Sequence, residues 1–352
     1  MRYDEKYKKN IKAMFFLKNY VMITSSLQSS ARSCKISQQN GGNYMEYEKF
    51  VDIMRKKVEN LSENGTKVII MEICKNNGVK KKGLMVKAKD CNMAPTVYLE
   101  EFYMEYKRGK TLEEIAEAVV SVYRNNNSIQ AFHMEDFKDF SQMKSQLVFR
   151  IINYEKNAPM LKSSPYITFL DLAIVPYVSF PVDGHNNGSV LVKNEHLEIW
   201  GINAETAMKI AAENTPKLLQ PQIRKMEDTI RQLIAAGGGE ERMEYEMFLE
   251  EMEENENKVP MYVLTNPKNL YGAACMVYDG VLEMFAEEMG EDIYILPSSI
   301  HEVILIPASK ALSSIELRTM VREINMTQIP TEEVLSDHVY KYSVQERGFC
   351  MI

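Results

Sequence analysis

Residues 259–308 read VPMYVLTNPKNLYGAACMVYDGVLEMFAEEMGEDIYILPSSIHEVILIPA, and their apolar pattern indicates the elements of the fold most clearly. Its first apolar run, Met261–Leu264, is followed by Asn266-Pro267, where proline removes a backbone donor and ends a strand. Apolar residues then recur at helical spacing from Ala274 to Met289, which predicts one amphipathic helix ended by Gly290.

Two continuous apolar runs, Ile293–Leu296 and Val303–Ile306, close the stretch. Runs without polar alternation are typical of strands buried on both faces, so we expect two central strands joined tightly around Pro297-Ser298-Ser299. The sequence therefore predicts an α+β fold: a mixed, mostly antiparallel sheet with covering helices, preceded by a smaller helix-hairpin-helix unit.

The smaller unit is predicted to span residues 45–162. Apolar spacing from Tyr47 to Leu61 indicates its first helix, and Asn76-Asn77-Gly78 predicts a hairpin turn because these residues tolerate positive φ. Further helices are expected, including one over Phe137–Tyr154. The lysines Lys80–Lys82 are interpreted as a solvated strand edge.

The second domain is predicted to span residues 163–345 and to contain an acidic loop, 237–258. Phe169–Val178 predicts a strand whose Pro176 favours an edge position or a bulge. Apolar spacing and capping residues predict the remaining elements. These are helices Asn203–Leu219, Ile223–Ala235 and Ile315–Met326, a strand Val339–Tyr342, and a frayed tail Phe349–Ile352.

Residues 1–44 are polar, rich in serine and asparagine, and without periodicity, so they are predicted to be disordered or a non-native extension. Met45 offers a second start. The codons of Gly41-Gly42 can read as a bacterial ribosome-binding site at a suitable distance, and the expected natural chain begins at Met45.

Composition excludes several classes of protein. The five cysteines are scattered without a CxxC pair, which indicates neither a disulfide framework nor a zinc site and favours a reducing cytoplasm. No apolar run approaches the roughly 20 residues of a membrane span. The net charge is −7, and the segment Glu240–Lys258 carries nine glutamates against two basic residues. Nucleic acid is therefore not an expected partner.

Cys275 and His301 are the first candidate catalytic pair. The helix expected around Cys275 would place its thiol near a helix N-terminus, where the dipole lowers a thiol pKa, and the sheet could bring His301 near it. Ser298, Ser299 and Glu302 lie beside His301 and complete this candidate hydrolase set. The alternative is that Cys275 is a small core residue and that the serines belong to the turn.

His196 and Glu198 are two residues apart and would share a face of a strand, where they could hold a metal with His185. The alternative is a surface histidine beside a carboxylate. Asn214 and Thr215 precede a proline within a helical pattern, where they either satisfy the loosened backbone or line a binding pocket. The chain has no Walker loop, GxGxxG or HExxH motif, so no cofactor is predicted.

Several short motifs resemble an uncharacterised bacterial family, a domain of unknown function found mainly in anaerobic gut Firmicutes. They are spread over Met45–Tyr342: Asn76-Asn77-Gly78, Ala94-Pro95-Thr96, Ile152–Glu155, Phe169–Leu172, Glu213–Pro216, Met261–Asn266, Leu296–Glu302 and Leu335-Ser336-Asp337. The chain is more distantly similar to a second uncharacterised cytoplasmic family of Bacillus type. Neither resemblance implies an activity or a ligand.

Two hypotheses for function follow from the sequence. The first is a cytoplasmic, non-enzymatic interaction or regulatory module that binds a protein partner through Glu240–Lys258. The second is a hydrolase or metal-dependent enzyme with a site near Cys275, Ser299, His301 and Glu302.

Overall fold

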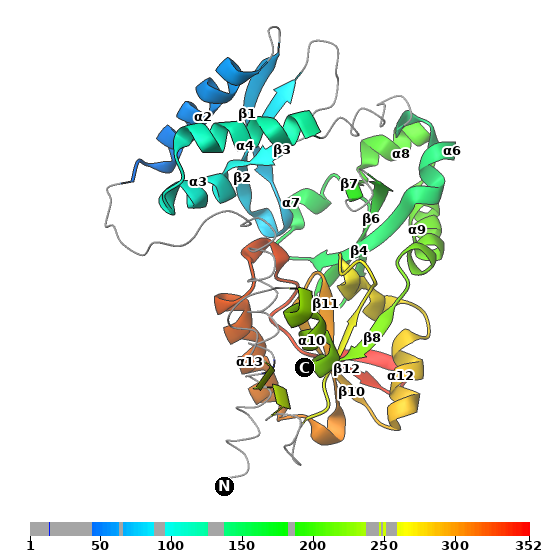
Figure 1. The fold of residues 1–352 in the computed structure, drawn as a ribbon. Coiled ribbons are helices and arrows are strands. Elements are labelled where there is room, and N and C mark those ends of the chain that lie inside the picture. Colours follow the sequence, from blue (N-terminus) through cyan, green and yellow to red (C-terminus); the bar gives the residue numbers. More distant parts are fainter. Residues whose placement is uncertain are drawn as a thin grey trace.

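The computed structural model describes Met14 and residues 44–62, 66–87, 96–125, 137–181, 187–236, 246–247, 249–250 and 259–352. Its elements form three antiparallel sheets with covering helices, which confirms the α+β prediction (Figure 1). Every strand pairing among these residues is antiparallel.

The N-terminal unit is a three-stranded sheet covered by three helices. Its elements are α2 (Tyr47–Leu61), β1 (Lys67–Cys74), the turn η1 (Asn76–Gly78), β2 (Lys80–Lys87), β3 (Thr96–Tyr98), α3 (Leu99–Lys107) and α4 (Leu112–Asn125). Phe50 and Met54 of α2 pack with Leu84 of β2 and Ile115 of α4 in a core of their own. The predicted helix-hairpin-helix unit is confirmed.

A four-stranded sheet follows, with β6 paired to β4 on one side and to β5 and β7 on the other. Its elements are α6 (Phe140–Met143), η3 (Lys144–Gln146), β4 (Leu147–Asn153), α7 (Ala158–Leu161), β5 (Ile167–Phe169), β6 (Leu172–Pro181), β7 (Asn187–Leu191), α8 (Asn194–Trp200) and α9 (Ala204–Leu218).

The third sheet has six strands in the order β13-β12-β10-β11-β9-β8. Its elements are β8 (Gln222–Lys225), α10 (Met226–Ala236), β9 (Tyr262–Thr265), η4 (Gly272–Val277), α12 (Val281–Met289), β10 (Ile293–Ser299), β11 (Glu302–Pro307), η5 (Ala308–Lys310), α13 (Ser314–Thr327), η6 (Thr331–Glu333), β12 (Tyr340–Ser343) and β13 (Gly348–Met351).

The central strands of this sheet are buried on both faces. Val303 and Leu305 of β11 pack in the cluster that contains α12 and η4, whereas Ile304 and Ile306 pack with α10 and α13. Two apolar faces explain why these strands read as continuous apolar runs, and the prediction of central strands is confirmed. Met14 and Leu249 are buried in the cluster that contains α10 and α13.

Some predicted elements are wrong. Residues 147–153 of the expected helix Phe137–Tyr154 form the buried strand β4, which pairs with β6, so the predicted boundary at residue 162 divides one sheet. Strand β6 is internal, and Pro176 lies between the stretches that pair with β5 and with β7. The expected frayed tail contains β13, which pairs with β12.

The helix expected from Ile223 begins only at Met226, because residues 222–225 form strand β8 beside β9. The lysines Lys80–Lys82 lie on the middle strand of the N-terminal sheet but extend beyond the part paired with β3. There, the Lys82 N–H donates to Oε1 of Glu100 (2.7 Å).

The turn η1 joins the N-terminal unit to the rest of the chain. Asn77 has a φ of 58°, and its Nδ2 donates to the carbonyl oxygens of Thr331 (2.8 Å) and Val334 (2.7 Å). Asn76 Nδ2 donates to the Glu332 carbonyl oxygen (2.7 Å). Figure 1 shows the hairpin tip meeting the segment between α13 and β12. The predicted hairpin turn is therefore also a docking element.

Candidate functional site

The loop that follows β9 is held in one conformation by Asn266. Its Nδ2 donates to the Leu270 carbonyl oxygen (2.8 Å), and its Oδ1 accepts the Lys268 N–H (3.0 Å). Tyr271 lies in the left-handed region with a φ of 54°, which is uncommon for an aromatic residue. The loop therefore presents the Tyr271 ring at a fixed place.

Gly272 allows this loop to approach the β10–β11 turn closely. A Cβ at this position would lie 2.2 Å from Oγ1 of Thr265, 2.7 Å from the His301 carbonyl oxygen and 2.8 Å from the Asn266 backbone nitrogen. Two of these three neighbours are backbone atoms, so a side chain at residue 272 would have to displace the backbone.

His301 lies in the β10–β11 turn and packs against Tyr271, with ring centroids 5.5 Å apart. The backbone N–H of Tyr271 donates to Nδ1 of His301 (3.2 Å), so the proton of the neutral ring resides on Nε2. Nε2 is 3.7 Å from Oε1 of Glu333. Both ring nitrogens are thus directed at protein groups other than a serine or a cysteine.

Arg150 of β4 lies between two tyrosine rings. Its Cζ is 2.9 Å from the ring centroid of Tyr177 and 3.8 Å from that of Tyr271, and its Nη2 donates to Oγ of Ser189 (3.0 Å). Burial raises the pKa of Tyr177, and the nearby Arg150 charge partly opposes that rise. Tyr177, Arg150, Tyr271 and His301 form a continuous stack, called here the Arg150 column.

Ser298, Ser299 and Glu302 are buried and take part in the turn itself. Oγ of Ser299 accepts the backbone N–H of His301 (3.0 Å), and Oγ of Ser298 donates to Oε1 of Glu302 at 3.5 Å. A hydrolase serine would instead donate its proton to an imidazole nitrogen. The structure brings these residues together with His301, but in turn-forming roles.

Cys275 is not near the start of an α-helix, so that prediction is wrong. The expected single helix is interrupted at Gly280, which has a φ of 74°, and Cys275 lies in the separate turn η4. The thiol is fully buried and donates to the Thr265 carbonyl oxygen (3.4 Å). Burial raises its pKa to about 12, although the nearby Tyr278 hydroxyl partly opposes the rise.

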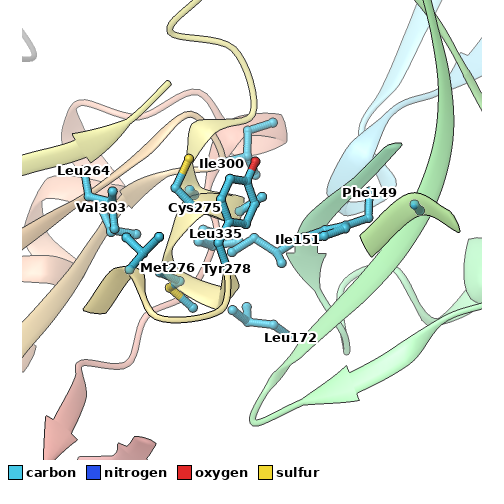
Figure 2. Packing of buried hydrophobic residues seen from close by; sticks show 14 of the residues in the cluster. Phe149, Ile151, Leu172, Leu264, Cys275, Met276, Tyr278, Ile300, Val303 and Leu335 are labelled. Carbon is cyan, nitrogen blue, oxygen red and sulfur yellow. The ribbon is translucent and has the colours of Figure 1, made fainter. Parts of the chain in front are cut away.

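Figure 2 shows why Cys275 is inaccessible. It lies in the layer between the two larger sheets, with Leu264 and Val303 of the six-stranded sheet on one side and Phe149 and Ile151 of the four-stranded sheet on the other. An enclosed thiol with a raised pKa packs as a core residue, which disfavours a role as a nucleophile.

Asn214 and Thr215 fasten α9 to the beginning of β4. Asn214 Nδ2 donates to the carbonyl oxygens of Lys144 (2.8 Å) and Leu147 (3.0 Å). Oγ1 of Thr215 donates to the Ala211 carbonyl oxygen (2.5 Å) and accepts the Phe149 N–H (2.9 Å). These contacts are far from the β10–β11 turn in the sequence and serve helix-to-strand packing.

His196 and Glu198 are on helix α8, so the prediction that they share a strand face is wrong. Nδ1 of His196 accepts the Lys193 N–H (3.1 Å) at the start of that helix, and burial lowers the pKa of the imidazole. His185 lies outside the described residues. Within the described part of the chain, no three His, Cys, Asp or Glu side chains are grouped to hold a metal ion.

Asp171 is the centre of a second polar cluster that the sequence analysis did not single out. In the turn between β5 and β6, its carboxylate accepts hydrogen bonds from Oγ of Ser336 (2.6 Å) and the hydroxyl of Tyr340 (2.7 Å), and it lies 3.1 Å from Nδ1 of His338. The side chains of Ser336 and His338 both contact the carboxylate, and Oγ of Ser336 accepts the backbone N–H of His338 (2.9 Å) and does not donate to its imidazole, so this is not a catalytic triad.

Arg150 was also missed, although the sequence does contain a signal for it. It is the one charged residue in the run Leu147–Ile152, and a charge inside a buried strand needs a partner. The signal was lost because this run was assigned to a helix, where Arg150 would have been placed on the solvent face.

Comparison with known proteins identifies a family but indicates no activity. A family model described as a family of unknown function (DUF5688) matches residues 47–344, so the chain belongs to this family. No curated protein and no solved structure matches the chain significantly. Among the helices that the structure describes, none is both long and apolar enough to cross a membrane.

Proposed function

We propose that this member of the DUF5688 family is a non-enzymatic interaction or regulatory module that works in a bacterial cytoplasm, in the anaerobic gut Firmicutes to which its motifs point. The observation that carries the proposal is the state of the candidate nucleophiles. Cys275, Ser298 and Ser299 are each at most 1% exposed, and all three are engaged in packing or in the β10–β11 turn.

Thiol reactivity tests this part of the proposal. In the native protein, exposed Cys74 and Cys350 should react quickly with a chromogenic disulfide reagent, while Cys275 should react only after unfolding. Mass spectrometry identifies the labelled sites. Labelling of native Cys275 at the rate of Cys74 would contradict a non-enzymatic role and favour the cysteine hydrolase.

The proposed partner surface is the acidic segment Glu240–Lys258, which would attract a basic protein surface. Nine glutamates and two basic residues give this segment a net charge of −7, equal to that of the whole chain. The structure describes only residues 246–247 and 249–250 of it, and Leu249 is buried in the cluster of α10 and α13. Met247 is exposed beside it. Negative charge and an exposed apolar side chain are both components of a protein-binding surface.

The charges at Lys80–Lys82 support a protein partner over nucleic acid. Lys80 pairs with Glu72 (2.8 Å), Lys81 with Glu332 (2.5 Å) and Lys82 with Glu48 (3.7 Å). Each lysine of this cluster already has a carboxylate partner, whereas a nucleic-acid site needs lysines that are available to phosphates.

Cross-linking in the native host tests the partner surface. The nine glutamates of Glu240–Lys258 are replaced by glutamine, and the control variant carries Glu287→Gln and Glu288→Gln on the exposed face of α12. We expect the main cross-linked proteins to be lost from the first variant and retained by the control. Identical cross-linked proteins in wild type and both variants would remove the segment from the proposal.

A further inference from the structure

The guanidinium of Arg150 is a buried charge that no carboxylate neutralises. The residue is 8% exposed, and no described Asp or Glu lies within ion-pair distance of it. An arginine is always charged, and burying a charge is costly unless it is paired. The rings of Tyr177 and Tyr271 offset only part of that cost through cation–π attraction.

The donors of Arg150 are used incompletely by the protein. A guanidinium offers five N–H donors, and the described residues accept a hydrogen bond from Nη2 alone, through Ser189. Nε and Nη1 have no protein acceptor, yet neither is fully enclosed, because no Arg150 nitrogen is among the buried polar atoms that lack a partner. These two nitrogens therefore retain contact with solvent.

The two tyrosine rings decide how a ligand can approach. Because Cζ is only 2.9 Å and 3.8 Å from the two ring centroids, we infer that the rings occupy opposite faces of the guanidinium and leave a ligand its edge, in the plane of the N–H groups. That direction suits a bidentate contact with two oxygens of a carboxylate or phosphate. At the other end of the column, Glu333 lies beside His301 and makes that end less favourable for an anion.

We propose that Arg150 binds a small oxyanion, a carboxylate or phosphate group, edge-on between the rings of Tyr177 and Tyr271. This inference goes beyond the interaction module proposed above, because it needs no protein partner. The β9–η4 loop, fixed by Asn266 and Gly272, preorganises the site by holding Tyr271 on the guanidinium.

The test is a titration of the full-length protein followed by NMR of the arginine side-chain Nε–H groups. Arg150→Lys identifies the Arg150 resonance by its loss, and Tyr177→Phe identifies the same resonance by its displacement should the first variant not fold. One arm uses inorganic phosphate and the other sodium succinate, each against sodium chloride at equal ionic strength.

We expect a saturable shift of the Arg150 resonance in at least one arm, and the responding arm tells phosphate from carboxylate. Isothermal titration calorimetry gives the affinity of wild type and of Arg150→Lys, which has no such resonance. Arg150→Lys should bind about 10- to 100-fold more weakly, because it loses the planar fork. The control Arg224→Lys, at a side chain hydrogen-bonded to Gln232, should leave binding unchanged. The proposal is overturned by the absence of saturation in both arms, by an equal response to chloride, or by unchanged affinity in Arg150→Lys.

Discussion

Asp171 and Arg150 are two charged side chains of the same four-stranded sheet, and they differ in the partners that surround their charges. The Asp171 carboxylate contacts polar groups of Ser336, His338 and Tyr340, so protein groups stabilise its charge. Arg150 has aromatic rings on its faces and one hydroxyl at its edge. A polar cluster whose groups are hydrogen-bonded to one another stabilises the fold, whereas a cluster with unused donors can bind a ligand.

The largest effect is expected from Asp171→Ala. The change leaves the buried Tyr340 hydroxyl without its acceptor and disconnects the β5–β6 turn from β12, so the free energy of unfolding should fall by about 3–5 kcal/mol. Urea unfolding measures it. Asp171→Asn keeps an acceptor oxygen and should cost less. A loss below about 1 kcal/mol for Asp171→Ala would show that the cluster is not a structural tie.

The next largest loss of stability is expected from Gly272→Ala, which forces the β9–η4 loop away from the β10–β11 turn. The added Cβ meets backbone atoms of Asn266 and His301, so we expect a loss of about 2–3 kcal/mol. Gly348→Ala is the control, because its nearest neighbour would be 3.5 Å away. Equal unfolding free energies of the two variants would mean that the close approach at Gly272 is not needed.

Arg150→Met should change stability by no more than about 1 kcal/mol, because an apolar side chain removes the cost of an unneutralised charge while losing the cation–π attraction. A small loss here beside a large loss for Asp171→Ala would show that the two charged side chains have different roles. Urea unfolding under the same conditions gives the answer. A loss as large as that of Asp171→Ala would assign Arg150 a structural role.

The smallest effect is expected when acid protonates Glu332, whose ion pair with Lys81 links the N-terminal unit to η6. Burial acts to raise the pKa of Glu332, but the hydrogen bond from Lys81 and other favourable contacts outweigh it, so the pKa is lowered. A lowered carboxyl pKa stabilises the fold above the ordinary glutamate value and loses that contribution as pH falls through the folded value.

The acid dependence is measured by comparing urea unfolding of wild type and Glu332→Gln between pH 7 and roughly 3.5. The wild type should lose up to about 1 kcal/mol more than the variant over this range, since the pair is partly screened by solvent. Glu72→Gln, which removes the exposed partner of Lys80, is the control. Parallel curves for wild type and Glu332→Gln would exclude a contribution from this pair.

The central strands of the six-stranded sheet could be predicted because their apolar sequence indicates that both of their faces are buried. Val303–Ile306 alternates between two apolar faces, and a run that is apolar throughout is typical of such a strand. Strand β4 shows the limit of this reasoning. Leu147–Asn153 is also buried on both faces, yet it follows helical residues, and periodicity alone does not separate a short buried strand from a buried helix.

The site was harder to predict because its contacts are distant in the sequence. Asp171 and Tyr340 are 169 residues apart, and no local pattern connects them. His301 was found because it lies beside Ser298 and Ser299 in the predicted turn, but Arg150, which joins the column through Tyr271, comes from another sheet. Cys275 was misplaced for a local reason, since extended Tyr278 ends the turn η4 and left-handed Gly280 begins the separate helix α12.

The hairpin tip at Asn77 has a consequence for how the chain is made. Its partner Thr331 is 254 residues further along, so a ribosome adding 5–20 residues per second reaches it roughly 13–50 s after Asn77. The N-terminal unit has its own core and can fold in that interval. Until residues 331–334 have been synthesised, the Nδ2 donors of Asn76 and Asn77 lack the backbone acceptors that they bind in the folded protein.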